Sequence, residues 1–97
     1  MTDYLREILK KLEDVLKELP FTYDDDNLWV HANKFRNLYM RYIRKAISEV
    51  IKKYKIKDPQ KRFKIMYYGY MACVDVFYYG EDAYNYWSPK INQLFEE

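Results

Sequence analysis

Hydrophobic residues recur at spacings of three and four along most of this chain, which is the repeat of an α-helix with one buried face. The first such segment runs from about Asp3 to Leu19, with Thr2 as its N-cap and Pro20 as its stop. It predicts an amphipathic helix whose polar side carries two ion pairs at i,i+4 spacing, Glu7 with Lys11 and Glu13 with Lys17.

A second and much longer helical pattern follows a loop that we predict at residues 20–27. The run Asp24-Asp25-Asp26 in this loop lacks the spacing of a calcium-binding loop, so we interpret it as capping the helix that follows. The pattern continues from Leu28 to about Ile56. A helix of that length would measure about 40 Å, which exceeds the width of a domain of this size, so we expect part of it to project.

The third segment is the most apolar part of the chain, and it has clear start and stop signals in Asp58-Pro59 and Gly80. Between Phe63 and Tyr79, hydrophobic residues occupy nearly every side of the predicted helix, which indicates that the rest of the domain surrounds it. Three sectors can be distinguished along this helix: a large apolar sector of Phe63, Met66, Tyr67, Tyr70, Val74 and Phe77, a small-residue sector of Gly69, Ala72, Cys73 and Val76, and a more polar sector around Asp75.

Helical spacing continues from residue 81 to residue 96, with Ser88-Pro89 in the middle. This dipeptide is compatible with one kinked helix or with the start of a second short helix. No segment alternates between apolar and polar residues for long enough to predict a strand. We therefore predict one all-α domain over residues 1–97, a compact bundle of four or five helices in which the long helix at about 28–56 packs on the apolar helix at about 59–79.

The 97 residues carry a net charge of only +2, but the charges are strongly segregated. Residues 1–33 hold four basic and eight acidic side chains, and residues 65–97 hold one basic and five acidic side chains, so each part has a net charge of −4. Residues 34–64 hold twelve basic and two acidic side chains, a net charge of +10. This segregation makes the long helix the strongest candidate for electrostatic binding.

Basic side chains form a stripe on the expected solvent side of the long helix, and such a stripe suits the phosphates of a nucleic acid or an acidic protein. A third alternative is that the acidic first and last helices neutralise the stripe, within one copy or across a dimer. The candidate binding residues are Lys34, Arg41, Arg44, Lys45, Lys52 and Lys55, with Tyr39, Tyr42 and Tyr54 as candidates for stacking on bases.

Sequence motifs for catalysis are absent, because the chain has only two glycines, one histidine and one cysteine. We predict no catalytic residue, no metal and no cofactor. His31 is interpreted as a histidine at the edge of the core, and Cys73 as a small buried hydrophobic residue. A buried carboxylate is costly without a partner, so we hypothesise that Asp75 forms a buried polar pair with Arg36.

These observations favour a small non-catalytic helical interaction protein, acting as a regulator, an inhibitor or an assembly subunit. It would bind a protein partner through aromatic residues and the basic helix face, and self-association as a homodimer is part of the same prediction. The alternative is a sequence-tolerant nucleic-acid-binding protein that uses the basic stripe of the second helix. No run of about 18 apolar residues occurs, so we expect no membrane association and predict a cytoplasmic location.

Overall fold

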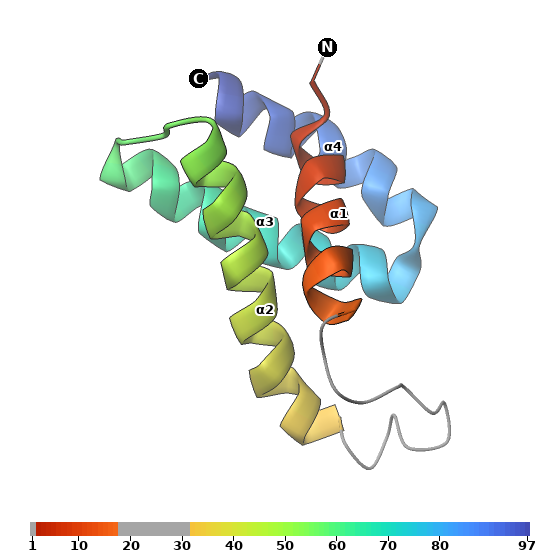
Figure 1. Ribbon diagram of the computed structural model, residues 1–97. Helices are drawn as coiled ribbons and strands as arrows, with labels where there is room; N and C mark the ends of the chain where they lie inside the picture. Colours follow the sequence, from red (N-terminus) through yellow and green to blue (C-terminus); the bar gives the residue numbers. More distant parts are fainter. Residues whose placement is uncertain (1, 18–31) are drawn as a thin grey trace.

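The computed structural model describes residues 2–17 and 32–97, without the side chains of residues 16 and 32–39. This part of the chain forms four α-helices and no strand, which confirms the all-α prediction (Figure 1). The predicted loop at 20–27, its three aspartates and His31 lie outside the described residues. The helices are α1 (Tyr4–Lys17), α2 (Ala32–Lys53), α3 (Pro59–Tyr79) and α4 (Glu81–Glu96).

The boundaries of α3 coincide with the sequence signals. The side chain of Asp58 accepts a hydrogen bond from the Gln60 backbone N–H at 3.1 Å, and Pro59 occupies the first helical turn. Gly80 follows the helix with a φ of 70°, a conformation that residues with a Cβ rarely adopt. Because Gly80 alone separates α3 from α4, the chain reverses sharply there, and the two helices pack against each other.

The last segment is one helix with Pro89 in its interior, and not two separate helices. The first helix is capped by Asp3 rather than by Thr2, because the Asp3 Oδ1 atom accepts the Arg6 backbone N–H at 3.2 Å. Asp3 also accepts hydrogen bonds from the hydroxyl groups of Tyr84 and Ser88, which ties the start of α1 to α4. Asp3 therefore both caps α1 and holds it against α4.

The hydrophobic core lies where the four helices meet (Figure 1). In Figure 1 the N-terminal end of α2, coloured yellow, extends past the other three helices, as expected for a long helix. Among the described side chains of α1 and α2, the buried residues recur at spacings of three and four, as the hydrophobic pattern of each segment predicts. The buried core residues in the described part of the chain are Leu5, Ile8, Leu12, Val15, Ile43, Ala46, Ile47, Val50, Ile51, Ile65, Ala72, Cys73, Ala83, Trp87, Ile91 and Phe95.

The prediction that α3 is surrounded by the other helices is wrong. Its buried positions are the small-residue side, Ile65, Gly69, Ala72 and Cys73. Half of the large apolar sector lies on the surface instead, with Phe63 71%, Tyr67 55% and Phe77 59% exposed. The other half, Met66, Tyr70 and Val74, is half-buried against the core. The three other helices can cover one side of the 21-residue α3 but cannot enclose it. They approach most closely on the side of α3 that lacks bulky side chains.

Gly69 shows how tight this approach is. A Cβ atom at Gly69 would lie 3.0 Å from the Cδ1 atom of Ile47 on α2, which is closer than ordinary van der Waals contact. Ile47 is itself completely buried, so it has little room to move away. The absence of a side chain at Gly69 is thus what lets α2 and α3 pack together at this point.

We predict that the effect of Gly69→Ala changes sign with the size of residue 47. In the wild-type background the new methyl group overpacks the core, and we expect a loss of about 1 kcal/mol in the free energy of unfolding. In an Ile47→Val background Cδ1 is gone, so Gly69→Ala should raise that free energy through better helix propensity, by about 0.5–1 kcal/mol. Urea unfolding of the two single variants and the double variant measures this. An equal effect of Gly69→Ala in both backgrounds would show that the contact with Cδ1 is unimportant.

Candidate functional site

Four of the predicted binding residues lie together on the surface of α2. Arg41, Arg44, Lys45 and Lys52 are all exposed, and they occupy the side of the helix opposite the buried Ile43 and Val50. From the first to the last of them the helix rises about 16 Å. None of the four forms an ion pair within the described part of the chain. The side chain of Lys34 lies outside the described residues, so its predicted role stays a prediction.

Lys55 lies beyond the end of the helix. The helix ends at Lys53, before the predicted Ile56, because the backbone N–H groups of Lys55 and Ile56 turn back to the carbonyls of Lys52 and Ile51, each at 3.1 Å. This double hydrogen bond is the Schellman motif, which requires a residue with positive φ. Lys55 takes that position with a φ of 55°, where glycine is usual. Lys55 therefore has a structural role in addition to its exposed charge.

The predicted stacking residues Tyr42 and Tyr54 are half-buried against the core. The ring of Tyr54 meets that of Tyr4 edge to face at 4.9 Å, and Tyr4 in turn stacks on Phe95 at 4.4 Å between centroids. Such contacts leave the faces of Tyr54 little access to a base. The side chain of Tyr39 lies outside the described residues.

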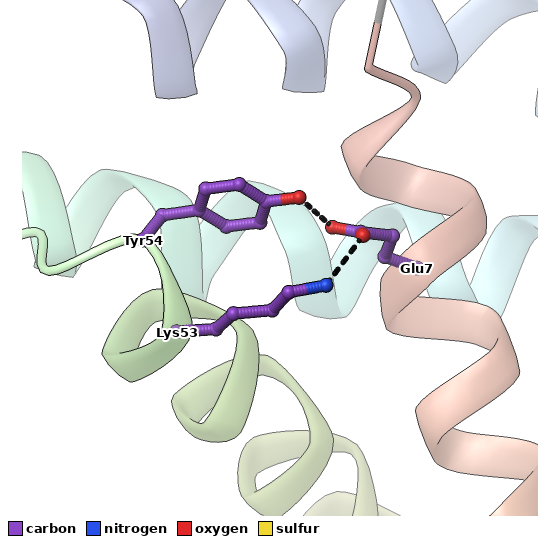
Figure 2. Close-up of polar contacts among 3 residues, drawn as sticks. All are labelled: Glu7, Lys53 and Tyr54. Atoms are coloured by element: carbon purple, nitrogen blue, oxygen red, sulfur yellow. Dashed lines mark hydrogen bonds and ion pairs between the residues drawn. The ribbon is translucent and has the colours of Figure 1, made fainter.

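Glu7 lies at the centre of a polar cluster with Lys53 and Tyr54 (Figure 2). Its carboxylate accepts a hydrogen bond from the Lys53 ammonium at 2.8 Å and another from the Tyr54 hydroxyl at 2.5 Å. These two donors lower the pKa of Glu7, whereas the same carboxylate raises the pKa of Lys53 and the pKa of Tyr54. The cluster connects α1 to the last turn of α2.

The predicted Glu7–Lys11 pair is thereby replaced, and Lys11 bonds instead to Glu49 of α2 at 3.5 Å. The predicted pair of Glu13 with Lys17 is confirmed at 3.6 Å. Helical spacing identifies only neighbours on the same helix, so it predicted that Glu7 pairs with Lys11 on the solvent side of α1. It could not identify Lys53 or Glu49, because their approach depends on how α2 packs against α1.

Asp75 is half-buried, and its hydrogen-bond partner in the described part of the chain is a tryptophan. The indole N–H of Trp87 on α4 donates to the Asp75 Oδ2 atom at 2.7 Å. The hypothesised contact with Arg36 stays a prediction, since the Arg36 side chain lies outside the described residues. Trp87 was not singled out in the sequence. Trp87 lies 12 residues after Asp75 in the sequence and reaches it only because the chain turns at Gly80.

Cys73 is buried, and this raises the pKa of its thiol to about 12. The group is therefore protonated at neutral pH and is a poor nucleophile. In the described residues, no three of the His, Cys, Asp and Glu side chains lie close enough together to hold a metal ion. Within the same ranges, no helix combines the length and the hydrophobicity that spanning a membrane requires.

The exposed side of α3 carries several large aromatic side chains, and we call it the aromatic face. It includes Phe63, Tyr67, Tyr68, Met71 and Tyr78. Around its N-terminal half lies a shallow groove of about 510 Å³, lined by Pro59, Gln60, Phe63, Lys64, Tyr67 and Tyr68. Sequence reasoning assigned these rings to the core. The signal that could have located them is the small-residue sector on the other side of the helix, because only one of the two sectors can face the neighbouring helices.

We predict that Glu7→Gln lowers the free energy of unfolding by about 1 kcal/mol near neutral pH, because an amide binds the Lys53 ammonium less strongly than a carboxylate does. The pKa of Glu7 in the folded state lies below its ordinary value of 4.5, so its contribution is present above that pH and is lost as the pH falls through the lowered value. The two proteins should therefore converge in acid.

The raised pKa values of Lys53 and Tyr54 imply that the same cluster keeps its strength on the alkaline side until the pH exceeds their ordinary values of 10.5 and 10.0. Urea unfolding of wild type and Glu7→Gln across this pH range tests the cluster. Glu13→Gln is the matched control, because among the described residues Glu13 bonds only to the exposed Lys17 and should show almost no effect. A pH-independent difference for Glu7→Gln would contradict the assignment.

We also predict that Lys55→Gly raises the free energy of unfolding by about 1 kcal/mol, since glycine adopts the positive φ of this position without strain. Lys57→Gly serves as the control: it removes the same charge two residues later, where no positive φ is recorded, and should not stabilise the protein. Thermal or urea unfolding of both variants measures the difference. Equal effects would mean that charge, and not backbone conformation, is responsible.

Comparison of the chain with models of protein families, with curated proteins and with solved structures finds no match in any of the three.

Proposed function

We propose that this chain is a small non-catalytic helical interaction protein that binds a protein partner through the aromatic face of α3. The basic side of α2 would provide a second contact for acidic groups of the partner. The single observation that supports this proposal most directly is the exposure of large aromatic side chains along a well-formed helix.

The aromatic face is not needed to complete the core. The opposite side of α3 already contributes Ile65, Ala72 and Cys73 to a core in which all four helices take part. Each exposed ring keeps apolar area in contact with water, at a cost of roughly 25 cal/mol per Å² compared with burial. Tyrosine and other aromatic side chains are also enriched among the residues that dominate binding energies at protein interfaces. A partner protein would remove this area from water.

The environment of the rings favours specific binding over nonspecific adhesion. The rings of Phe63 and Tyr67 lie nearly parallel, with an interplanar angle of 14° and centroids 6.4 Å apart. Tyr67 meets Tyr68 edge to face at 5.3 Å. These rings thus support one another in defined orientations, and Lys64 lies beside them on the wall of the groove. Side chains held in place before binding lose less conformational freedom when a partner docks.

The alternative function is sequence-tolerant binding of nucleic acid. The observation that favours it is the exposed group of Arg41, Arg44, Lys45 and Lys52, which lacks ion-pair partners among the described residues. The tyrosines expected to stack on bases support it less, because Tyr42 and Tyr54 are packed against the core. We rank it second for that reason. A cytoplasmic location is part of the proposal and rests on the sequence alone.

A photo-crosslinking experiment tests the proposed function. The full chain would carry benzoylphenylalanine in place of Tyr67 or Tyr79, two exposed tyrosines of the same helix that point in different directions. After illumination in a cell extract, we expect defined protein adducts from position 67 and several-fold fewer from position 79. Mass spectrometry would identify the adducts, and circular dichroism would establish that both proteins are folded.

A salt titration with arbitrary DNA and RNA decides between the two functions. Two results together would overturn the proposal and establish the alternative. The first is the absence of defined adducts at position 67. The second is steeply salt-dependent binding of nucleic acid that the double substitution Arg41→Glu with Arg44→Glu abolishes. Weak binding that this double substitution leaves unchanged would count against a role of the basic side in nucleic-acid recognition.

A further inference from the structure

The exposed side of α3 contains one continuous stripe. Phe63, Tyr67, Met71, Val74 and Tyr78 follow one another at spacings of four, four, three and four residues. At about 100° per residue they fall within an arc of about 80°, directly opposite the buried Ile65, Gly69 and Ala72. Four of the five are exposed, and Val74 is half-buried. A row with these spacings is the surface that a second helix fits along.

Four of the five residues pair symmetrically about a midpoint that lies between Tyr70 and Met71, and Met71 pairs with Tyr70. When a second copy of α3 runs in the opposite direction about that point, Phe63 comes opposite Tyr78 and Tyr67 comes opposite Val74. A large ring at each end then meets another ring, and the smallest residue of the stripe meets a tyrosine. The stripe is thus complementary to itself in the antiparallel direction, which is what a two-fold symmetric interface requires.

The net charges at the two ends of α3 are complementary in the same direction. Residues 57–64, at the N-terminal end of α3, hold four basic side chains and one acidic side chain, a net charge of +3. Residues 75–82, at its C-terminal end and the start of α4, hold Asp75, Glu81 and Asp82 and no basic residue, a net charge of −3. An antiparallel pair places each positive end against a negative end, whereas a parallel pair places like charges together.

One contact across this pair can be specified. Lys64 and Asp75 lie on the same flank of the stripe, and in antiparallel helices equal flanks face each other. The symmetric register brings Lys64 of one copy to within about one helical turn of Asp75 of the other. Trp87 occupies only the Oδ2 atom of Asp75, so the Oδ1 atom can accept a bond from a lysine.

We infer that the partner of the aromatic face is a second copy of this chain, bound antiparallel through α3 about a two-fold axis near Tyr70 and Met71. This inference rests on the proposed function and specifies its partner. The exposed fractions of the stripe correspond to about 500 Å² per copy, since a buried aromatic side chain covers about 150–250 Å². Two copies together would bury about 1,000 Å², which is less than the roughly 1,200–2,000 Å² of stable complexes, so we expect a weak dimer in exchange with monomer.

The location of the interface is tested by two neighbouring tyrosines that are equally exposed, Tyr78 and Tyr79, each at 74%. Tyr78 belongs to the stripe, and Tyr79 points about 100° away from it. Sedimentation of the full chain over a range of concentrations should give a dimer constant at least about tenfold weaker for Tyr78→Ala and within about twofold of wild type for Tyr79→Ala. Circular dichroism would show that both variants are folded. Equal effects of the two substitutions would overturn the interface.

The orientation is tested by reversing the charge at one end at a time. Lys61→Glu with Lys64→Glu makes both ends of α3 negative, and Glu81→Lys with Asp82→Lys makes both ends positive. For each variant alone, the dimer constant should be about tenfold weaker or more. An equimolar mixture of the two should form a mixed dimer. In a parallel dimer the first variant would change the facing N-terminal ends from +3 against +3 to −1 against −1. Unchanged or tighter self-association of this variant would therefore overturn the antiparallel arrangement.

The matched control is Lys10→Glu with Lys17→Glu on α1, two exposed lysines outside both the stripe and the basic side of α2, which makes the same change in net charge and should leave the dimer constant unchanged. A wild-type chain that stays monomeric at every concentration overturns the inference. If the crosslinker at position 67 then still captures other proteins, the proposed function stands with a different partner. If it captures none, the proposed function fails as well.

Discussion

The close contact between α2 and Gly69 is the constraint on which the other features of this structure depend. With no side chain at Gly69, the Cδ1 atom of Ile47 reaches the backbone of α3. This contact selects the rotation of α3 about its own axis, because only the small-residue side lets neighbouring helices come this close. Once that side faces inward, the rings on the opposite side must face outward. The surface of the protein is thus a consequence of a packing choice in its core.

The remaining helices are held by polar contacts at the edges of the core. Asp3 caps α1 and accepts hydrogen bonds from two residues of α4, and the backbone N–H of Tyr4 donates to the side chain of Asn92 at 2.9 Å. One turn later, Glu7 binds the end of α2. Polar contacts of this kind add less to stability than apolar burial does. Their directionality, however, sets how α1 lies between α2 and α4.

Two surfaces of different chemistry result from this arrangement, the aromatic face of α3 and the basic side of α2. The basic side provides long-range attraction, which accelerates encounter but discriminates poorly among partners. The aromatic face provides short-range contact area, which decides how long a complex lasts. An interaction protein benefits from both, and the opposite net charges at the two ends of α3 add an orientation preference that neither surface supplies alone.

The sequence by itself was sufficient for the local features. Helical spacing, Asp58-Pro59 and Gly80 identify the helices and the limits of α3, because caps and turns depend on residues close together in the chain. The inward residues of α1 and α2 followed from the same spacing, since each of these helices has one apolar side. Arg41, Arg44, Lys45 and Lys52 were placed on the surface because no apolar residue interrupts their row.

Only the tertiary structure decided which side of α3 faces the core, since both of its candidate sides are apolar and helical spacing cannot rank them. Whether the small-residue sector or the aromatic sector faces inward depends on how closely other helices can approach each side, which is a property of two helices packed together. The partners of Glu7 and Asp75 were undetermined for the same reason. Lys53 and Trp87 come within reach through the packing of different helices. A pattern along one helix carries no information on the geometry between two.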